Sequence, residues 1–144
     1  MAKADMKNDA LKQGDVFFFP YLWKAEAKKG ITDSKERTCC LAFNSSPPTG
    51  RRYYIIVPIS DRNSEADTSL VVPAIEKQRA GLNPARPAYV HVDEFNFDPT
   101  EGSIIRKAKP KILGRFSKKF TEQIASALAI RIKLKSATGI DRRN

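Results

Sequence analysis

Short runs of apolar and β-branched residues, separated by turn-forming residues, follow one another along most of the chain. Such runs predict strands, because β-branched and aromatic side chains pack well on a pleated sheet. The third run continues into Pro58, which places that strand at a sheet edge or gives it a bulge near its end. The predicted strands lie at 16–19, 37–43, 53–57, 70–72 and 88–93, whereas 103–105 and 112–113 are short apolar pieces among basic residues.

The hydrophobic period changes from that of a strand to that of a helix near the C-terminus. Phe120, Ile124 and Leu128 recur at helical spacing, and Ser117 precedes them as a suitable N-cap. The charged stretch 24–36, which contains a glycine, predicts a long exposed loop instead.

These elements predict one domain, mainly β, in which a strongly bent sheet or small barrel packs beside a C-terminal helix. The domain is expected to span residues 13–132. A flexible N-terminus at 1–12 precedes it, and a basic tail at 133–144 is expected to fray.

The net charge of +10 indicates an anionic partner, because 26 Lys and Arg oppose only 16 Asp and Glu. The basic residues are dense between Glu101 and Glu122, where no acidic residue interrupts them. A solubilising surface would also explain them, but the excess along the whole chain favours a nucleic acid. A membrane partner is not expected, because the terminal helix lacks Trp and no apolar run approaches the ~20 residues that span a bilayer. The dense basic residues are Arg106, Lys107, Lys109, Lys111, Arg115, Lys118 and Lys119.

The adjacent cysteines Cys39 and Cys40 lie inside an apolar run, so on a strand they point to opposite faces and cannot bond to each other. They are expected to be buried thiols of a reducing compartment. Together with the single histidine they fall short of a structural zinc set, so no metal and no cofactor is expected. The N-terminus has no apolar core typical of a signal peptide, and a cytoplasmic protein is expected.

Candidate chemistry outside any known motif is sparse. Trp23, beside the charged stretch, is the best candidate to stack on an unpaired base. His91 is close in sequence to Asp93 and Glu94, which leaves an acid–base role open, although a lone strand histidine is more often a packed or surface residue. The sequence contains no Gly-rich phosphate loop, no dinucleotide fingerprint and no Ser-His-Asp pattern.

Several motifs, taken in order over roughly residues 12–131, resemble the MazF/PemK family of toxin endoribonucleases, and its PemK-like branch in particular. A first strand follows Gly-Asp, an arginine opens the second strand, and the third ends in a small hydroxyl residue. The motifs are Gly14-Asp15-Val16-Phe17-Phe18-Phe19-Pro20, Arg37-Thr38-Cys39-Cys40, Ile55-Ile56-Val57-Pro58-Ile59-Ser60, the segments 72–82 and 89–96, and Leu113-Gly114-Arg115-Phe116-Ser117.

The resemblance implies an SH3-like barrel of the CcdB/MazF type that forms a homodimer and is silenced by a cognate acidic antitoxin. It also implies cleavage of single-stranded RNA without a metal, by attack of the ribose 2′-hydroxyl. The catalytic arginine and hydroxyl correspond to Arg37 and Ser60. A guanidinium fork can bind two phosphate oxygens at once, and a hydroxyl at a strand end can hold the 2′-hydroxyl in line.

This sequence departs from the family pattern around the arginine. Thr38 stands where proline is common, and the usual Gly-Ser-Glu-Gln segment is missing. The general acid or base therefore stays open among Asp33, Glu36, His91 and Glu94. Ser60 is not expected to be a covalent nucleophile, because no base is evident beside it. The residues assigned to RNA binding are Trp23, Lys24, Lys28, Lys29, Lys35, Arg51, Arg52 and Arg115.

Two other functions fit the same predicted fold, because fold does not determine function. One is a CcdB-like toxin that binds gyrase, which would need neither the charge nor Arg37. The other is a non-catalytic RNA-binding barrel, which the charge and the aromatic residues alone would support.

Overall fold

The computed structural model describes residues 11–32, 35–45, 50–62, 68–101 and 110–142. The described chain is mainly β, as predicted, with a long helix near its C-terminal end. The short apolar piece at 103–105, part of the dense basic segment and the acid–base candidate Asp33 lie outside the described residues. The strands are β1 Asp15–Phe19, β2 Arg37–Ser45, β3 Tyr53–Ser60, β4 Ser69–Val71, β5 Tyr89–His91, β6 Glu94–Pro99, β7 Ile112–Arg115 and β8 Thr138–Asp141, and the helices are α2 Lys24–Lys28, α3 Ala74–Ala80 and α5 Lys118–Lys133.

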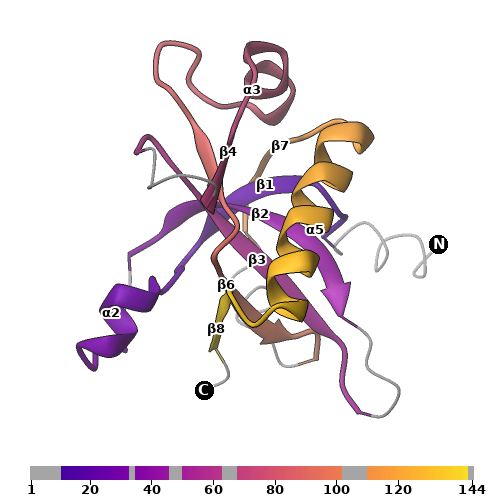
Figure 1. Cartoon of the computed structure of the whole chain (residues 1–144). Helices are drawn as coiled ribbons and strands as arrows, with labels where there is room; N and C mark the ends of the chain where they lie inside the picture. The colour runs from indigo at the N-terminus through magenta and orange to yellow at the C-terminus, as the bar shows by residue number, and fades with distance from the viewer. Residues whose placement is uncertain (1–10, 33–34, 46–49, 63–67, 102–109, 143–144) are drawn as a thin grey trace, which may run out of the picture.

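The strands form one sheet in the order β4-β5-β3-β2-β1-β7, and β6 lies between β3 and β8 (Figure 1). Neighbouring strands are antiparallel except β6 and β8, which are parallel. Among the described strands the sheet does not close on itself, so the mainly β architecture is established and the barrel remains a prediction.

β3 is a central strand, so of the two alternatives predicted for Pro58, an edge strand or a bulge near its end, the edge is excluded. One side of β3 pairs with β2, where Cys39 faces Pro58. The other side pairs with β6 at one end and with β5 at the other. Pro58 lies where this second side changes partner, so its missing N–H falls at an irregular point of the ladder.

Both faces of the sheet are buried, each by a different hydrophobic cluster. Cys40 lies in the cluster that α5 covers, whereas Cys39 lies in the cluster on the opposite face, with Phe17 and Tyr21. The adjacent cysteines are therefore free and point to opposite faces, as predicted. Burial raises the pKa of both thiols, which keeps them protonated and unreactive.

α5 packs across the sheet and presents its apolar stripe to it (Figure 1). Ser117 is the N-cap, as predicted, and its Oγ accepts a hydrogen bond of 3.1 Å from the backbone N–H of Phe120. The same hydroxyl donates a 2.6 Å bond to the buried carboxylate of Glu76 on α3. One serine thus starts the long helix and ties it to a second one.

Replacing Ser117 with alanine is expected to destabilise the protein by about 1–2 kcal/mol, because both the cap and a partner of a buried carboxylate are lost. Thermal or denaturant unfolding measures the change. Ser136→Ala is the matched control: that serine is exposed, its bond to Arg131 is 3.4 Å long, and its loss is expected to cost less than about 0.5 kcal/mol. Equal effects of the two substitutions would contradict the role given to Ser117.

Two segments predicted to be irregular are structured. The stretch 24–36 begins with α2, whose sequence Lys-Ala-Glu-Ala-Lys favours helix and whose Glu26 accepts a 3.1 Å hydrogen bond from the N–H of Trp23. The basic tail contains β8, which pairs with β6. The tail was predicted to fray because it is basic and contains glycine, but its backbone is held by pairing with β6.

Candidate active site at one end of the sheet

Arg37 and Ser60 lie at the same end of the β2–β3 ladder. Cys39 pairs with Pro58 in antiparallel register. Arg37 lies two residues before Cys39 on β2 and Ser60 lies two residues after Pro58 on β3, so both lie in the same direction from this pair. Because side chains alternate along a strand, a shift of two residues returns to the face of the sheet on which Cys39 and Pro58 lie. The structure therefore brings the two predicted catalytic residues to one end and one face of the sheet.

A break between β5 and β6 supplies further polar groups to this end. Ile56 pairs with Asn96 and Ile59 with Val90, so three steps along β3 face six steps along the neighbouring segment. β5 ends at His91 and β6 begins at Glu94, so the short connection between the two strands, which contains Asp93, lies at this end of the sheet.

Ser60 has a base beside it, contrary to the expectation from the sequence. Its Oγ lies 2.7 Å from Nε2 of His91, and it also accepts a 3.2 Å bond from the backbone N–H of Arg62. Nε2 can accept the bond from the hydroxyl when the ring proton is on Nδ1, and the hydroxyl also lies 3.3 Å from the Arg62 carbonyl, to which it can donate instead. Burial lowers the pKa of His91, and the carboxylate of Asp93 and a backbone hydrogen bond to Arg62 offset this only in part. The imidazole is therefore neutral at neutral pH and able to take a proton.

The guanidinium of Arg37 is engaged by Glu26 of α2. Nη1 and Nη2 donate to the two carboxylate oxygens at 2.5 and 2.9 Å, and Nη1 also donates to the carbonyl of Tyr21 at 3.2 Å. The hydrogen bond from Arg37 lowers the pKa of Glu26, and the bond to Glu26 in turn raises the pKa of Arg37. The two side chains are 24% and 25% exposed, so the pair is reachable from solvent.

Trp23 connects the two halves of the site. Its ring packs edge-on against His91 at a centroid distance of 5.3 Å and against Tyr21 at 5.5 Å. Trp23 is only partly exposed, so base stacking would have to use the remaining open part of the ring.

Glu94 and the main chain of residues 21–24 are locked together. Glu94 accepts hydrogen bonds from the Tyr21 hydroxyl at 3.1 Å and from the Lys24 N–H at 3.0 Å, and Nζ of Lys24 contacts Asp93 at 2.9 Å. Burial raises the pKa of Glu94, although these bonds oppose the rise. Its inward position makes Glu94 an anchor for the segment before α2 and a poorer candidate than His91 to transfer a proton to substrate.

The other residues assigned to RNA binding divide into those near this end and those far from it. Lys28 and Lys29 lie on or next to α2, and Lys35 lies shortly before β2; all three are exposed, as is the acid–base candidate Glu36. These three lysines therefore leave exposed positive charge near Arg37.

Arg51, Arg52 and Arg115 are not brought to the site. The first two precede β3, whose other end carries Ser60. Arg115 faces Asp15 at the start of β1 and forms a 2.6 Å ion pair with it, whereas Arg37 faces Phe19 at the end of β1.

Glu26, Tyr21 and Arg62 also belong to the site and were not predicted from the sequence. Nothing in the local sequence signals that Glu26 meets a residue 11 positions away, because the intervening stretch shows no period. The helix-forming composition of Lys24–Lys28 was the available signal that this segment is ordered, and an ordered helix fixes the direction in which the Glu26 side chain points.

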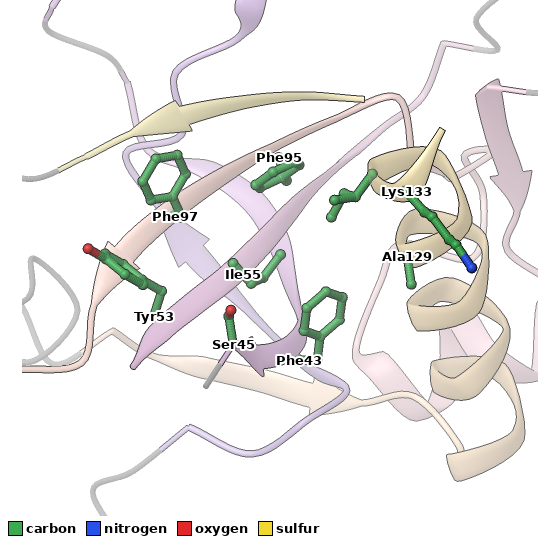
Figure 2. Close-up of a pocket in the computed structure, with 9 residues that line it drawn as sticks. Phe43, Ser45, Tyr53, Ile55, Phe95, Phe97, Ala129 and Lys133 are labelled. Atoms are coloured by element: carbon green, nitrogen blue, oxygen red, sulfur yellow. The ribbon is translucent and has the colours of Figure 1, made fainter. Parts of the chain in front are cut away.

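A separate apolar groove of about 440 Å³ lies between α5 and the opposite face of the sheet (Figure 2). Phe95 and Phe97 of β6 line it together with Tyr53 and Ile55 of β3, and Ala129 closes it from the helix. Tyr53 and Ile55 alternate with the residues that share the face of Ser60, so the groove does not adjoin the Ser60–His91 pair.

Within the described ranges no group of three or more His, Cys, Asp or Glu side chains is arranged to hold a metal ion. No helix in the same ranges is long and apolar enough to cross a membrane. Neither protein-family models nor curated proteins gave a match to this chain, so the resemblance to the MazF/PemK family stays a prediction.

Proposed function

We propose that this chain is a metal-independent endoribonuclease that cuts single-stranded RNA, and that its reacting phosphate binds at the end of the sheet that carries Arg37, Ser60 and His91. The observation that supports it most is the 2.7 Å contact between the Ser60 hydroxyl and Nε2 of His91. A hydroxyl and a base at this distance can pass a proton between them. The guanidinium of Arg37 lies at the same end of the β2–β3 ladder.

In the proposed reaction the ribose 2′-oxygen attacks the adjacent phosphorus. The 2′-hydroxyl gives its proton to Ser60 Oγ while the Ser60 proton passes to His91 Nε2, so that the serine relays a proton and forms no bond to phosphorus. The P–O5′ bond breaks, and the leaving oxygen takes a proton from solvent. The products are a 2′,3′-cyclic phosphate and a 5′-hydroxyl, and His91 returns its extra proton to solvent.

Arg37 supplies the positive charge that this transition state requires. Negative charge gathers on the non-bridging phosphate oxygens during attack, and a planar guanidinium can donate to two of them at once. The exposed Lys28 and Lys29 continue the positive surface away from the cut phosphate, which would steer an RNA strand toward it.

Cleavage is expected to continue in excess EDTA, because a base, a relay and a charge stabiliser are all provided by side chains. Gel analysis of a labelled single-stranded RNA measures it, with the product ends identified by phosphatase and kinase treatment. DNA of the same sequence is the matched control and is expected to stay intact, since it lacks the 2′-hydroxyl. Loss of cleavage in EDTA, or cutting of the DNA, would contradict the proposed chemistry.

A non-catalytic RNA-binding role is the second candidate, and the closed Arg37–Glu26 pair favours it. A guanidinium permanently held by a carboxylate would serve the fold alone, and the net charge of +10 would still attract RNA. Salt-sensitive RNA binding without cleavage would support this second function. The resemblance described above extends the first proposal to the toxin of a toxin–antitoxin pair, which would arrest growth through its nuclease activity.

A further inference from the structure

The contact between Arg37 and Glu26 has the geometry of a bound substrate anion. Two carboxylate oxygens meet two nitrogens of one guanidinium, at 2.5 and 2.9 Å. Two non-bridging oxygens of a phosphodiester would meet the same two nitrogens in the same planar arrangement. Glu26 and a phosphate at this position therefore exclude each other.

The helix that carries Glu26 is short and exposed. α2 has only five residues, too few for a helix that is stable by itself, and none of them is buried. The chain before α2 is fixed separately, because Asn96 exchanges two hydrogen bonds of 2.8 Å with the backbone of Leu22. On the other side Gly30 has φ of +79°, where the chain turns. Release of Glu26 from Arg37 can thus move its side chain and the rest of α2, while the start of the helix stays held by the bond from the Lys24 N–H to Glu94.

The charge around Glu26 favours a ligand that carries several negative charges. Lys28 and Lys29 on the same short segment are exposed, and the pair itself is open to solvent at about a quarter of each side chain. An incoming RNA strand would bring several phosphates to these cations while it displaces a single carboxylate.

We infer that Glu26 is an internal competitor of the scissile phosphate, which closes the Arg37 fork in the free protein and is displaced when single-stranded RNA binds. The inference rests on the proposed function, because it takes the Arg37 fork as the phosphate site. It explains how an arginine can be paired in the free protein and still act on substrate.

Binding of a fluorescent single-stranded RNA with 2′-O-methyl riboses tests the inference without cleavage. Glu26→Gln is expected to bind this probe about 5- to 10-fold more tightly than the unaltered protein, since the neutral amide competes weakly for the fork. Glu26→Asp keeps the charge but is one methylene too short to hold both nitrogens, and it is expected to bind more tightly as well. Glu122→Gln removes the same charge from the exposed face of α5 and is expected to change the dissociation constant less than about twofold.

With a cleavable RNA, Glu26→Gln is expected to lower KM by a similar factor and to leave kcat within about twofold. A residue that only orients Arg37 would lower kcat and leave binding unimproved. Affinity of both Glu26 variants equal to that of Glu122→Gln, or weaker, overturns the inference, as does absence of RNA binding in every variant. Tighter probe binding by Glu26→Gln in a protein that never cleaves RNA would uphold the inference and end the proposed catalysis.

Discussion

Replacement of Arg37 with alanine is expected to slow cleavage of single-stranded RNA by at least about 100-fold, the usual loss when one stabiliser of transition-state charge is removed. The expected loss lies mainly in kcat, because the charge that Arg37 balances grows during attack on phosphorus. Single-turnover kinetics with a labelled RNA measures it directly. In cells, the same substitution is expected to relieve any growth arrest that the unaltered chain causes.

The control for this prediction is Arg51→Ala, which removes the same charge at the far end of β3 from Ser60. It is expected to weaken RNA binding slightly and to leave kcat unchanged. Arg37→Lys keeps the charge without the fork and is expected to fall between the two. Undiminished cleavage by Arg37→Ala would show that the ion pair with Glu26 is structural and that Arg37 has no part in the reaction.

Replacement of His91 with alanine is expected to lower the cleavage rate by about 10²- to 10⁴-fold, the range typical for loss of a positioned general base. His91 is the single histidine of the chain, so a titration of activity near neutral pH can be assigned to it. Burial lowers its pKa, which means that it stays unprotonated to a pH below the ordinary value for histidine. Activity is therefore expected to be flat through neutral pH and to fall only at a pH below about 6.5.

His91→Gln separates proton transfer from simple orientation of Ser60. Glutamine can still bond to the Ser60 hydroxyl but does not titrate, so the variant is expected to be as slow as His91→Ala and to lose the acid limb of the pH profile. Retained activity in His91→Gln would mean that the histidine only positions Ser60. Because His91 is largely buried, the melting temperature of each variant serves as the measure of folding.

The predicted competition at Arg37 and the predicted base at His91 affect different kinetic quantities. Changes at Glu26 should appear in KM and in probe binding, whereas changes at His91 should appear in kcat and its pH dependence. The pair of experiments therefore tests substrate entry and chemistry independently, although Trp23 touches both parts of the site.

Local elements of this protein were largely readable from its sequence. Hydrophobic runs with a clear period predicted the strands β1, β2, β3 and β4 and the helix α5. Ser117 marks the start of α5 because serine is a favoured N-cap, and its Oγ accepts the capping hydrogen bond. The opposite orientation of Cys39 and Cys40 follows from strand alternation alone. Elements with weak periods were missed, including α3 and β6, because their stability comes from neighbours distant in sequence.

The candidate site was only partly predictable for the same reason. The sequence by itself determined the strong positive charge, the β-rich fold with its capped helix, and the placement of Arg37 and Ser60 at strand ends. Only the tertiary structure decided that β3 is central, that Ser60 meets His91 from 31 residues away, and that Glu26 closes the Arg37 fork. Periodicity and capping act between residues near in sequence, whereas strand pairing, bulges and ion pairs depend on which segments the packed core brings side by side.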